Sequence, residues 1–246
     1  MTEDLSVLTR PAREPDEVIA YGTHADQIAD VRRGKAGAER RPLVLFVHGG
    51  FWRPQYDRSG TGPLADAIAS AGWTVASIEY RRTPGEPDET LADAGNALLT
   101  LPARISGHRG GVILLGHSAG GHLVLWLTVT RGGPPLVGTL ALAPAADLRL
   151  AHELNLGDGA VLAFLGADPS TRPDLDPRRL SAPEIPTTIL HGDQDDVVPL
   201  SVTASYAAAH PSVRVVRLPG VGHFAPIDPL STSWDAVLEE LRRLSR

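Results

Sequence analysis

Residues 110–121 read GGVILLGHSAGG, and residues 122–129 continue as HLVLWLTV. The short apolar run at residues 112–115 predicts a strand that is buried on both faces. Residues 122–130 predict an apolar helix, and the turn between the two elements fits the G-x-S-x-G pattern with Ser118 at its centre. In the order strand, sharp turn and helix, this pattern is typical of a nucleophile elbow, which exposes a serine hydroxyl above the sheet edge.

The G-x-S-x-G match is weak on its own, because a glycine-rich chain of this length contains one by chance about one time in ten. A preceding apolar strand and a following helix reduce that chance to ~1 %. Glycines at positions 116 and 120 also suit a tight turn in which a side chain would meet the neighbouring strand or helix. Ser118 is therefore a candidate nucleophile, which requires a base, an acid and an oxyanion hole elsewhere in the chain.

Length and composition favour a single α/β domain over residues 1–246. Hydrophobic residues make up 42% of the chain, and the formal net charge of -6 argues against binding to nucleic acid or to an anionic membrane. The absence of cysteine excludes disulfides and thiolate metal sites. Residues 1–13 contain no apolar signal segment, and no apolar run reaches the ~20 residues that span a bilayer. We therefore predict a soluble cytoplasmic protein.

Predicted strands alternate with predicted helices along most of the chain. A hairpin at residues 17–33 is followed by strands at residues 42–47, 73–78, 112–115, 136–142, 186–190 and 213–218. This alternation predicts a mostly parallel sheet with right-handed crossovers and with its chemistry at the carboxyl ends of the strands. Residues 147–180 do not fit the alternation, and we expect them to form a short cap over the pocket.

The candidate base and acid follow Ser118 in the chain. His223 lies in a glycine-flanked loop after the last predicted strand, where a surface histidine is the alternative interpretation. The stretch HGDQDDVVP at residues 191–199 contains three aspartates, and the residues alone do not decide between Asp193, Asp195 and Asp196. The order serine, aspartate, histidine is that of the α/β-hydrolases and differs from the orders of chymotrypsin and subtilisin.

An oxyanion hole needs preorganised N–H donors close to the serine. The amide of Ala119 directly follows the nucleophile, and the turn after residues 42–47 offers the amides of Gly50 and Phe51. An ordinary turn between strand and helix is the alternative, because paired glycines are common in turns. Several other polar residues are better explained by structure: Glu79 and Arg81 as partners of each other or of Asp93, and His117 and His122 as packing or hydrogen-bonding residues.

The sequence resembles the α/β-hydrolase superfamily. It is similar to the HGG-bearing esterases and, more narrowly, to the arylformamidase-like (kynurenine formamidase-like) proteins. The matching stretches are His48-Gly49-Gly50-Phe51-Trp52, residues 116–123, the pattern HGxxDxxVP at residues 191–199, and Gly222-His223-Phe224. In related hydrolases the acid lies four residues before the proline of that pattern, which selects Asp195, with Asp196 as the alternative. Phe51 stands where many of these esterases have a third glycine.

The resemblance implies an α/β-hydrolase fold and a serine hydrolase acting on small carboxylic esters or on aryl amides and formamides. The partner would be a small-molecule substrate, and neither a metal nor an organic cofactor would be required. We expect the pocket to be lined by Trp52, His117, Phe164 and Phe224. Two alternatives are a peptidase of the prolyl oligopeptidase type, which the lack of a gating domain disfavours, and a non-catalytic binding protein on the same fold, which the presence of all three triad residues disfavours.

Overall fold

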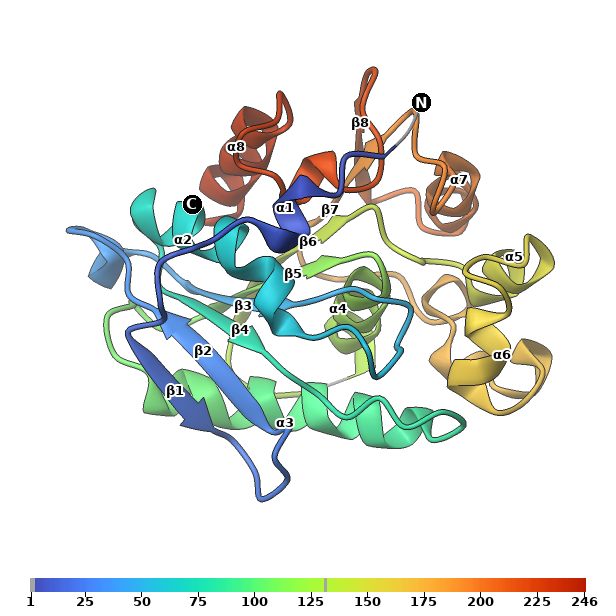
Figure 1. Ribbon diagram of the computed structural model, residues 1–246, viewed down its shortest axis with the longest axis horizontal. Helices are drawn as coiled ribbons and strands as arrows, with labels where there is room; N and C mark the ends of the chain where they lie inside the picture. Colours follow the sequence, from blue (N-terminus) through green and yellow to red (C-terminus); the bar gives the residue numbers. More distant parts are fainter. Residues whose placement is uncertain (1–2, 131) are drawn as a thin grey trace.

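The computed structural model describes residues 3–130 and 132–246, and a twisted sheet with helices on both faces forms its centre (Figure 1). The described residues form one 8-stranded sheet in the order β1-β2-β4-β3-β5-β6-β7-β8. The strands are β1 (Glu17–Ala20), β2 (Ile28–Arg32), β3 (Leu43–Val47), β4 (Val75–Ile78), β5 (Val112–His117), β6 (Leu136–Leu142), β7 (Thr187–Gly192) and β8 (Arg214–Leu218).

The predicted topology is confirmed. β1 and β2 pair as an antiparallel hairpin at the sheet edge, and β2 also runs antiparallel to β4. All strands from β4 to β8 in the sheet order pair in parallel. Val47 at the end of β3 lies opposite Gly116 of β5, so the turn after β3 and the elbow after β5 meet at the same edge.

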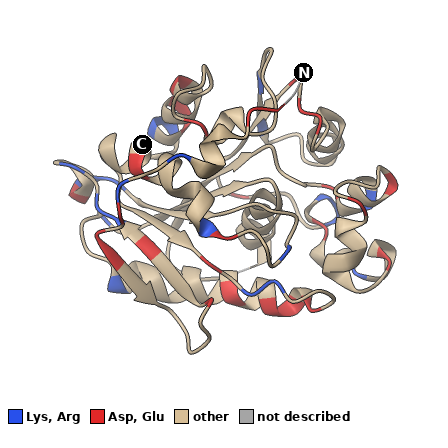
Figure 2. Cartoon of the chain, in the orientation of Figure 1, with Lys and Arg blue, Asp and Glu red and all other residues tan. Residues whose placement is uncertain are grey.

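Eight helices of the described residues surround the sheet: α1 (Ser6–Thr9), α2 (Gly62–Ser70), α3 (Pro87–Arg104), α4 (Ala119–Thr130), α5 (Leu148–Glu153), α6 (Ala160–Leu165), α7 (Leu200–Ala209) and α8 (Trp234–Leu244). The central strands β3 to β7 contain no Asp, Glu, Lys or Arg, and charged residues lie on the outer helices, loops and edge strands (Figure 2). Buried parallel strands read as continuous apolar runs because both of their faces are covered.

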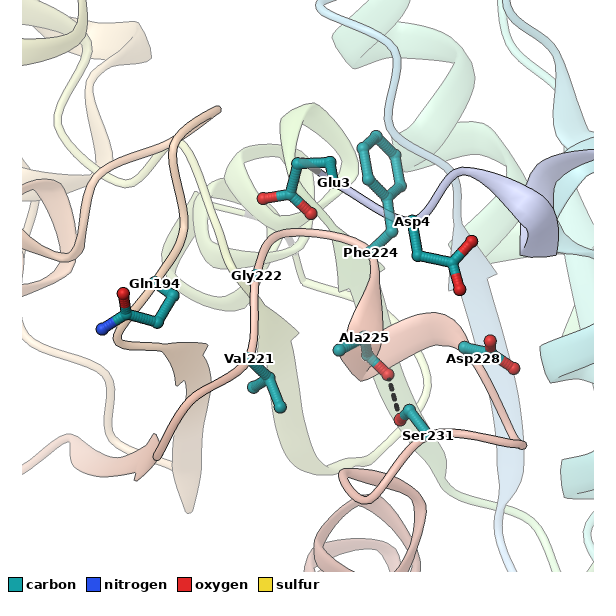
Figure 3. A pocket seen from close by; sticks show the side chains of 9 residues that line it. All are labelled: Glu3, Asp4, Gln194, Val221, Gly222, Phe224, Ala225, Asp228 and Ser231. Atoms are coloured by element: carbon teal, nitrogen blue, oxygen red, sulfur yellow. Dashed lines mark hydrogen bonds between the residues drawn. The ribbon is translucent and has the colours of Figure 1, made fainter. Parts of the chain in front are cut away.

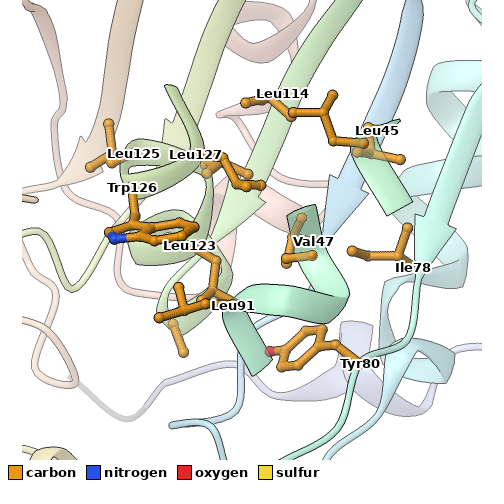
Figure 4. Close-up of a cluster of buried hydrophobic side chains, with 14 of the residues drawn as sticks. Leu45, Val47, Ile78, Tyr80, Leu91, Leu114, Leu123, Leu125, Trp126 and Leu127 are labelled. Atoms are coloured by element: carbon orange, nitrogen blue, oxygen red, sulfur yellow. The ribbon is translucent and has the colours of Figure 1, made fainter. Parts of the chain in front are cut away.

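Two apolar clusters cover the two faces of the sheet. Leu45 and Leu114 point to the face covered by α3 and α4, where Leu91, Leu123 and Trp126 pack against them (Figure 4). The alternate strand residues point to the opposite face, which is covered by α2 and α8. Fully burying such a leucine contributes about 1.5–3 kcal/mol, so the two clusters fix the strands that end at the candidate site.

Residues 147–180 depart from the strand–helix alternation, as the sequence indicates. They contain α5, α6 and three short 3₁₀ turns. Val161, Phe164 and Leu165 of this segment are buried in the cluster on the α3–α4 face. No helix in the described part of the chain is long and apolar enough to cross a membrane.

Candidate active site

Ser118 occupies the sharp turn between β5 and α4. Its φ of 55° lies in the left-handed region, which is uncommon for a residue with a side chain and costs on the order of 1–3 kcal/mol. The turn is possible because Gly120 has no side chain: a Cβ there would lie 2.1 Å from the carbonyl oxygen of Val47. This position also places Ser118 at the N-terminus of α4, where the helix dipole favours developing negative charge.

The turn after β3 lies directly against Ser118. A Cβ at Gly49 would be 2.9 Å from the Cβ of Ser118. Gly50, Phe51 and Trp52 follow with φ values of 111°, 53° and 55°, so two residues with side chains adopt the left-handed conformation in succession. Within the described chain the backbone amides of Gly50 and Phe51 form no hydrogen bond, which leaves both N–H groups available to a bound oxygen.

A buried polar network supports this turn from below. The carboxylate of Glu79 accepts a hydrogen bond from the His48 ring at 3.0 Å and another from the Arg58 amide at 3.0 Å. The Tyr80 hydroxyl donates to the His48 carbonyl at 2.8 Å, and the two rings stack with centroids 4.4 Å apart. Glu79 also forms an ion pair with Arg82. The network therefore ties the end of β4 to the first residue of the turn.

The expected pairing of Glu79 with Arg81 is wrong, whereas the pairing of Arg81 with Asp93 is confirmed. Arg81 donates to Asp93 at 2.7 and 2.8 Å, and its side chain therefore points away from the turn. Glu79 lies two residues before Arg81, and its carboxylate pairs with the His48 ring instead. Sequence reasoning missed the His48–Glu79 contact because 31 residues separate the two positions.

His223 and Asp195 form a direct hydrogen-bonded pair. The Nδ1 of His223 donates to Oδ2 of Asp195 at 2.7 Å, while Oδ1 of Asp195 accepts the amides of Val197 and Val198 at 2.9 and 2.7 Å. Burial acts to raise the pKa of Asp195, but hydrogen bonds from His191 and His223 outweigh it and hold this pKa well below its usual range. Asp195 is therefore a buried, charged acceptor that fixes the orientation of the His223 ring.

The other two candidate aspartates lie elsewhere. Asp193 and Asp196 are both exposed, and Asp193 accepts the Gly220 amide at 2.8 Å. Asp195 is the aspartate of the three that contacts His223.

A second imidazole, which sequence reasoning missed, contacts the same oxygen of Asp195 as His223 does. The Nε2 of His191 is 3.1 Å from Oδ2 of Asp195 and 2.8 Å from the Val198 carbonyl, and its Nδ1 is 2.7 Å from the Thr203 hydroxyl. Because Nε2 faces two acceptors, it carries the proton, and Nδ1 accepts from Thr203. His191 is the first residue of the HGxxD pattern, and its place in that pattern was the sequence signal that could have predicted this contact.

Ser118 and His223 line one cavity of about 430 Å³, together with Gly50, Phe51 and His117. Phe224 lines it as well, as expected. The Ser118 hydroxyl makes no hydrogen bond to the His223 ring within the described structure. Catalytic hydrogen bonds of this kind are often long without substrate and tighten in the complex, so both groups remain a candidate pair.

Trp52 and Phe164, by contrast, do not line this cavity. Their rings stack with centroids 4.5 Å apart in the apolar cluster on the α3–α4 face, where Trp52 also meets His122 edge-on. The left-handed backbone at Phe51 and Trp52 reverses the chain and turns the Trp52 side chain into the core. No residue of 147–180 lines the cavity either, and Leu5 and Leu8 near the N-terminus belong to its apolar lining.

His117 and His122 are buried next to the elbow. The ring of His117 donates to the His223 carbonyl at 3.0 Å, and that of His122 donates to the Leu175 carbonyl at 2.8 Å. Burial lowers the pKa of His117 to about 3, with the neighbouring His223 adding to the effect, and burial lowers the pKa of His122 to about 4. Both rings are therefore neutral in the folded protein, in keeping with hydrogen-bonding roles.

These two histidines, together with the His48 ring, whose pKa burial lowers to about 3, make the folded state sensitive to acid. Their pKa values are lower in the folded chain than the value of 6.5 for an unperturbed histidine, so below pH 6.5 the unfolded chain takes up protons that the folded chain does not. We expect the free energy of unfolding, measured by urea denaturation, to fall by about 6 kcal/mol between pH 7 and pH 5, about 2 kcal/mol for each of the three rings.

The matched variant is His122→Gln, whose amide can still donate to the Leu175 carbonyl. It should lose only about two thirds as much stability over the same pH interval, because one of the three titrating rings is gone. An unfolding free energy that stays constant from pH 7 to pH 5 in the wild-type protein would contradict this assignment.

No group of three or more His, Cys, Asp or Glu side chains within residues 3–130 and 132–246 is arranged to hold a metal ion.

The chain is similar in sequence to curated hydrolases. The chain is 25% identical over 235 residues to esterase LipC of Mycobacterium tuberculosis, covering 83% of this chain and 58% of that protein. It is 28% identical over 137 residues to kynurenine formamidase of Danio rerio, covering 53% of this chain and 46% of that protein. The chain thus spans about half the length of these relatives.

The fold also matches solved structures. The crystal structure of esterase B from Lactobacillus Rhamnosis superposes with a TM-score of 0.77 at 21% identity, covering 98% of this chain and 89% of that chain. Residues 44–176 match a protein family described by its alpha/beta hydrolase fold. This match includes β3, the elbow and α4, and the chain therefore belongs to the α/β-hydrolase family.

Proposed function

We propose that this chain is a serine hydrolase that cleaves small carboxylic esters or aryl amides and formamides by acyl transfer. One observation carries the proposal: the strained Ser118 turn opens into the same cavity as His223, whose ring is oriented by the buried carboxylate of Asp195. A hydroxyl, a base and an acid in this order are the parts that nucleophilic catalysis by serine requires. The esterase and formamidase relatives support the same reaction class.

In the proposed mechanism, Oγ of Ser118 attacks the substrate carbonyl while Nε2 of His223 takes the hydroxyl proton. Asp195 stabilises the imidazolium that forms and keeps Nδ1 protonated. The amides of Gly50, Phe51 and Ala119 stabilise the oxyanion, a contribution that is typically worth about 3–4 kcal/mol for a single donor. His223 then returns the proton to the departing alcohol or amine, and a water molecule releases the acyl group by the reverse sequence.

The cavity favours substrates with a small acyl group. Phe51 follows Gly50 directly, so its ring lies where a third glycine would leave open space, and Phe224 adds a second ring. Flat aromatic walls of this kind suit an aryl leaving group and restrict a long acyl chain. The deep network of Glu79 and His48 keeps the turn carrying Phe51 in place.

A series of p-nitrophenyl esters from acetate to decanoate, assayed beside N-formylkynurenine, tests this substrate class. We expect acetate or butyrate to be cleaved fastest and turnover to fall gradually, because one misfitting methylene costs only ~1–3 kcal/mol. Decanoate cleaved faster than acetate would contradict the proposal for small acyl groups. Efficient ester cleavage without formamide cleavage would identify a carboxylesterase, and the converse result a formamidase.

A further inference from the structure

Residues 3–10, here called the N-terminal strap, lie beside the loop that carries His223. The strap contains α1 and begins with two acidic residues, which lie close to the N-terminal end of the trace in Figure 2. Its centre is anchored by Val7, which is buried in the apolar cluster on the α2–α8 face. From composition, this stretch was predicted only to be polar. Its position beside the His223 loop is known from the structure alone.

The first end of the strap is bound to the backbone of His223. Both carboxylate oxygens of Glu3 accept the His223 amide, at 2.8 and 2.9 Å. Figure 3 shows Glu3 beside Gly222 and Phe224 at the rim of a neighbouring pocket. The contact depends on glycine at position 222, because a Cβ there would lie 2.4 Å from Oε1 of Glu3.

The second end is bound five residues further along the same loop. Arg10 pairs with Asp228 through both of its terminal nitrogens, and its Nη2 lies 2.9 Å from Oδ2 of Asp228. The same nitrogen donates to the Ser6 hydroxyl at 3.1 Å, which ties α1 to the pair. Two-point guanidinium–carboxylate contacts fix orientation as well as distance. The strap is therefore attached at both ends to the segment that carries His223.

Between these attachments, Leu5 and Leu8 line the cavity that contains Ser118. Leu8 also approaches the opposite wall, since a Cβ at Gly60 would lie 3.6 Å from its Cδ2. Leu5 is 53% exposed although it is apolar. An apolar substituent of a bound substrate would cover this exposed surface and gain from its burial.

We infer that the N-terminal strap determines specificity, with Leu5 and Leu8 limiting the size of the apolar group that the site accepts. The inference rests on the proposed function and adds a size-selecting wall to it. Residues 147–180 do not take this role, because none of them lines the cavity. Glu3 and Arg10 attach the strap to the loop that carries His223. Leu5 and Leu8 are therefore held at a fixed position relative to the candidate base.

The test compares kcat/KM profiles of the wild-type protein and strap variants over two ester series. One series varies the acyl chain of p-nitrophenyl esters, and the other varies the alcohol of acetate esters from ethyl to naphthyl. The double variant Leu5→Ala/Leu8→Ala should raise the ratio of kcat/KM for long substrates to kcat/KM for short substrates by at least about tenfold in one of the series. Leu8→Trp should lower the same ratio by a similar factor.

Further variants separate the wall from its attachment. Glu3→Ala should relax size selection in the direction of the leucine double variant, whereas Glu3→Gln, which keeps one carbonyl acceptor for the His223 amide, should retain the wild-type profile. Leu162→Ala is the matched control, because this leucine on α6 is 42% exposed and does not line the cavity. Thermal unfolding and labelling by a fluorophosphonate identify variants that remain folded with a reactive serine.

Profiles of the leucine variants that superimpose on the wild-type profile in both series would overturn the inference and leave the proposed function intact. A shift caused by Leu162→Ala of the same size would also overturn it, since selection would then lie in residues 147–180. Absence of hydrolysis and of labelling in the wild-type protein would overturn the proposed function and, with it, this inference.

Discussion

Ser118→Ala is expected to lower kcat/KM for p-nitrophenyl acetate by at least about 10³-fold, because the hydroxyl forms the only covalent bond to the substrate in the proposed mechanism. The variant should also lose all labelling by a fluorophosphonate probe. Activity would not fall to the rate in water, since the amides of Gly50 and Phe51 would still stabilise the oxyanion of a direct attack by water.

Ser118→Ala tests the role of the hydroxyl without disturbing the fold. Alanine keeps the Cβ that packs against Gly49 and removes only the hydroxyl, so the left-handed turn at φ 55° is retained. Ser70→Ala at the exposed end of α2 is the matched control and should leave both activity and labelling unchanged. Residual turnover above a few per cent in Ser118→Ala would exclude this serine as the nucleophile. A wild-type protein that is never labelled would favour the non-catalytic binding protein.

The parallel sheet and its order of elements were predictable because local signals agree with the global packing. The runs at residues 42–47 and 112–115 are apolar on both faces, and only a strand covered on both sides buries every one of those side chains. The elbow was predictable for a similar reason. Its glycines are required by backbone contacts with adjacent elements, which leave a pattern in the sequence.

The walls of the cavity were not predictable to the same degree. Trp52 follows the oxyanion turn in sequence, but the left-handed conformation at two consecutive residues sends its side chain into the core against Phe164. No local propensity signals such a conformation at Phe51 and Trp52, since both residues normally avoid it. The N-terminal strap was missed because its contacts to His223 and Asp228 join positions about 220 residues apart.

The polar contacts around the site were predictable only in part. Arg81 and Asp93 are only 12 residues apart, and their opposite charges made the pairing foreseeable. Glu79 and His191 face partners that the sheet topology brings together, His48 across the sheet and Asp195 around a turn. The His48–Glu79 contact follows from the register of β3 and β4, and the His191–Asp195 contact from the conformation of the turn after β7. The sequence pattern specifies neither of these residue by residue.

Asp195→Asn is expected to lower kcat by about 10⁴-fold, the scale known for a triad carboxylate replaced by its amide. Four N–H groups converge on this carboxylate: the His223 and His191 rings on Oδ2, and the amides of Val197 and Val198 on Oδ1. Asparagine has one acceptor oxygen and one NH₂ group, so either orientation sets a donor against donors.

With the NH₂ group facing His223, the imidazole would move its proton to Nε2 and could no longer accept the proton of Ser118. With the NH₂ group facing Val197 and Val198, two buried amides would lose their acceptor and the loop would shift. Asp193→Asn and Asp196→Asn are the matched controls, and each should change kcat by less than about twofold because both side chains are exposed, whereas Asp195 is the buried carboxylate paired with His223. A larger loss at Asp196 than at Asp195 would transfer the role of the acid to Asp196, and it would mean that the contact seen between Asp195 and His223 does not persist in the reacting enzyme.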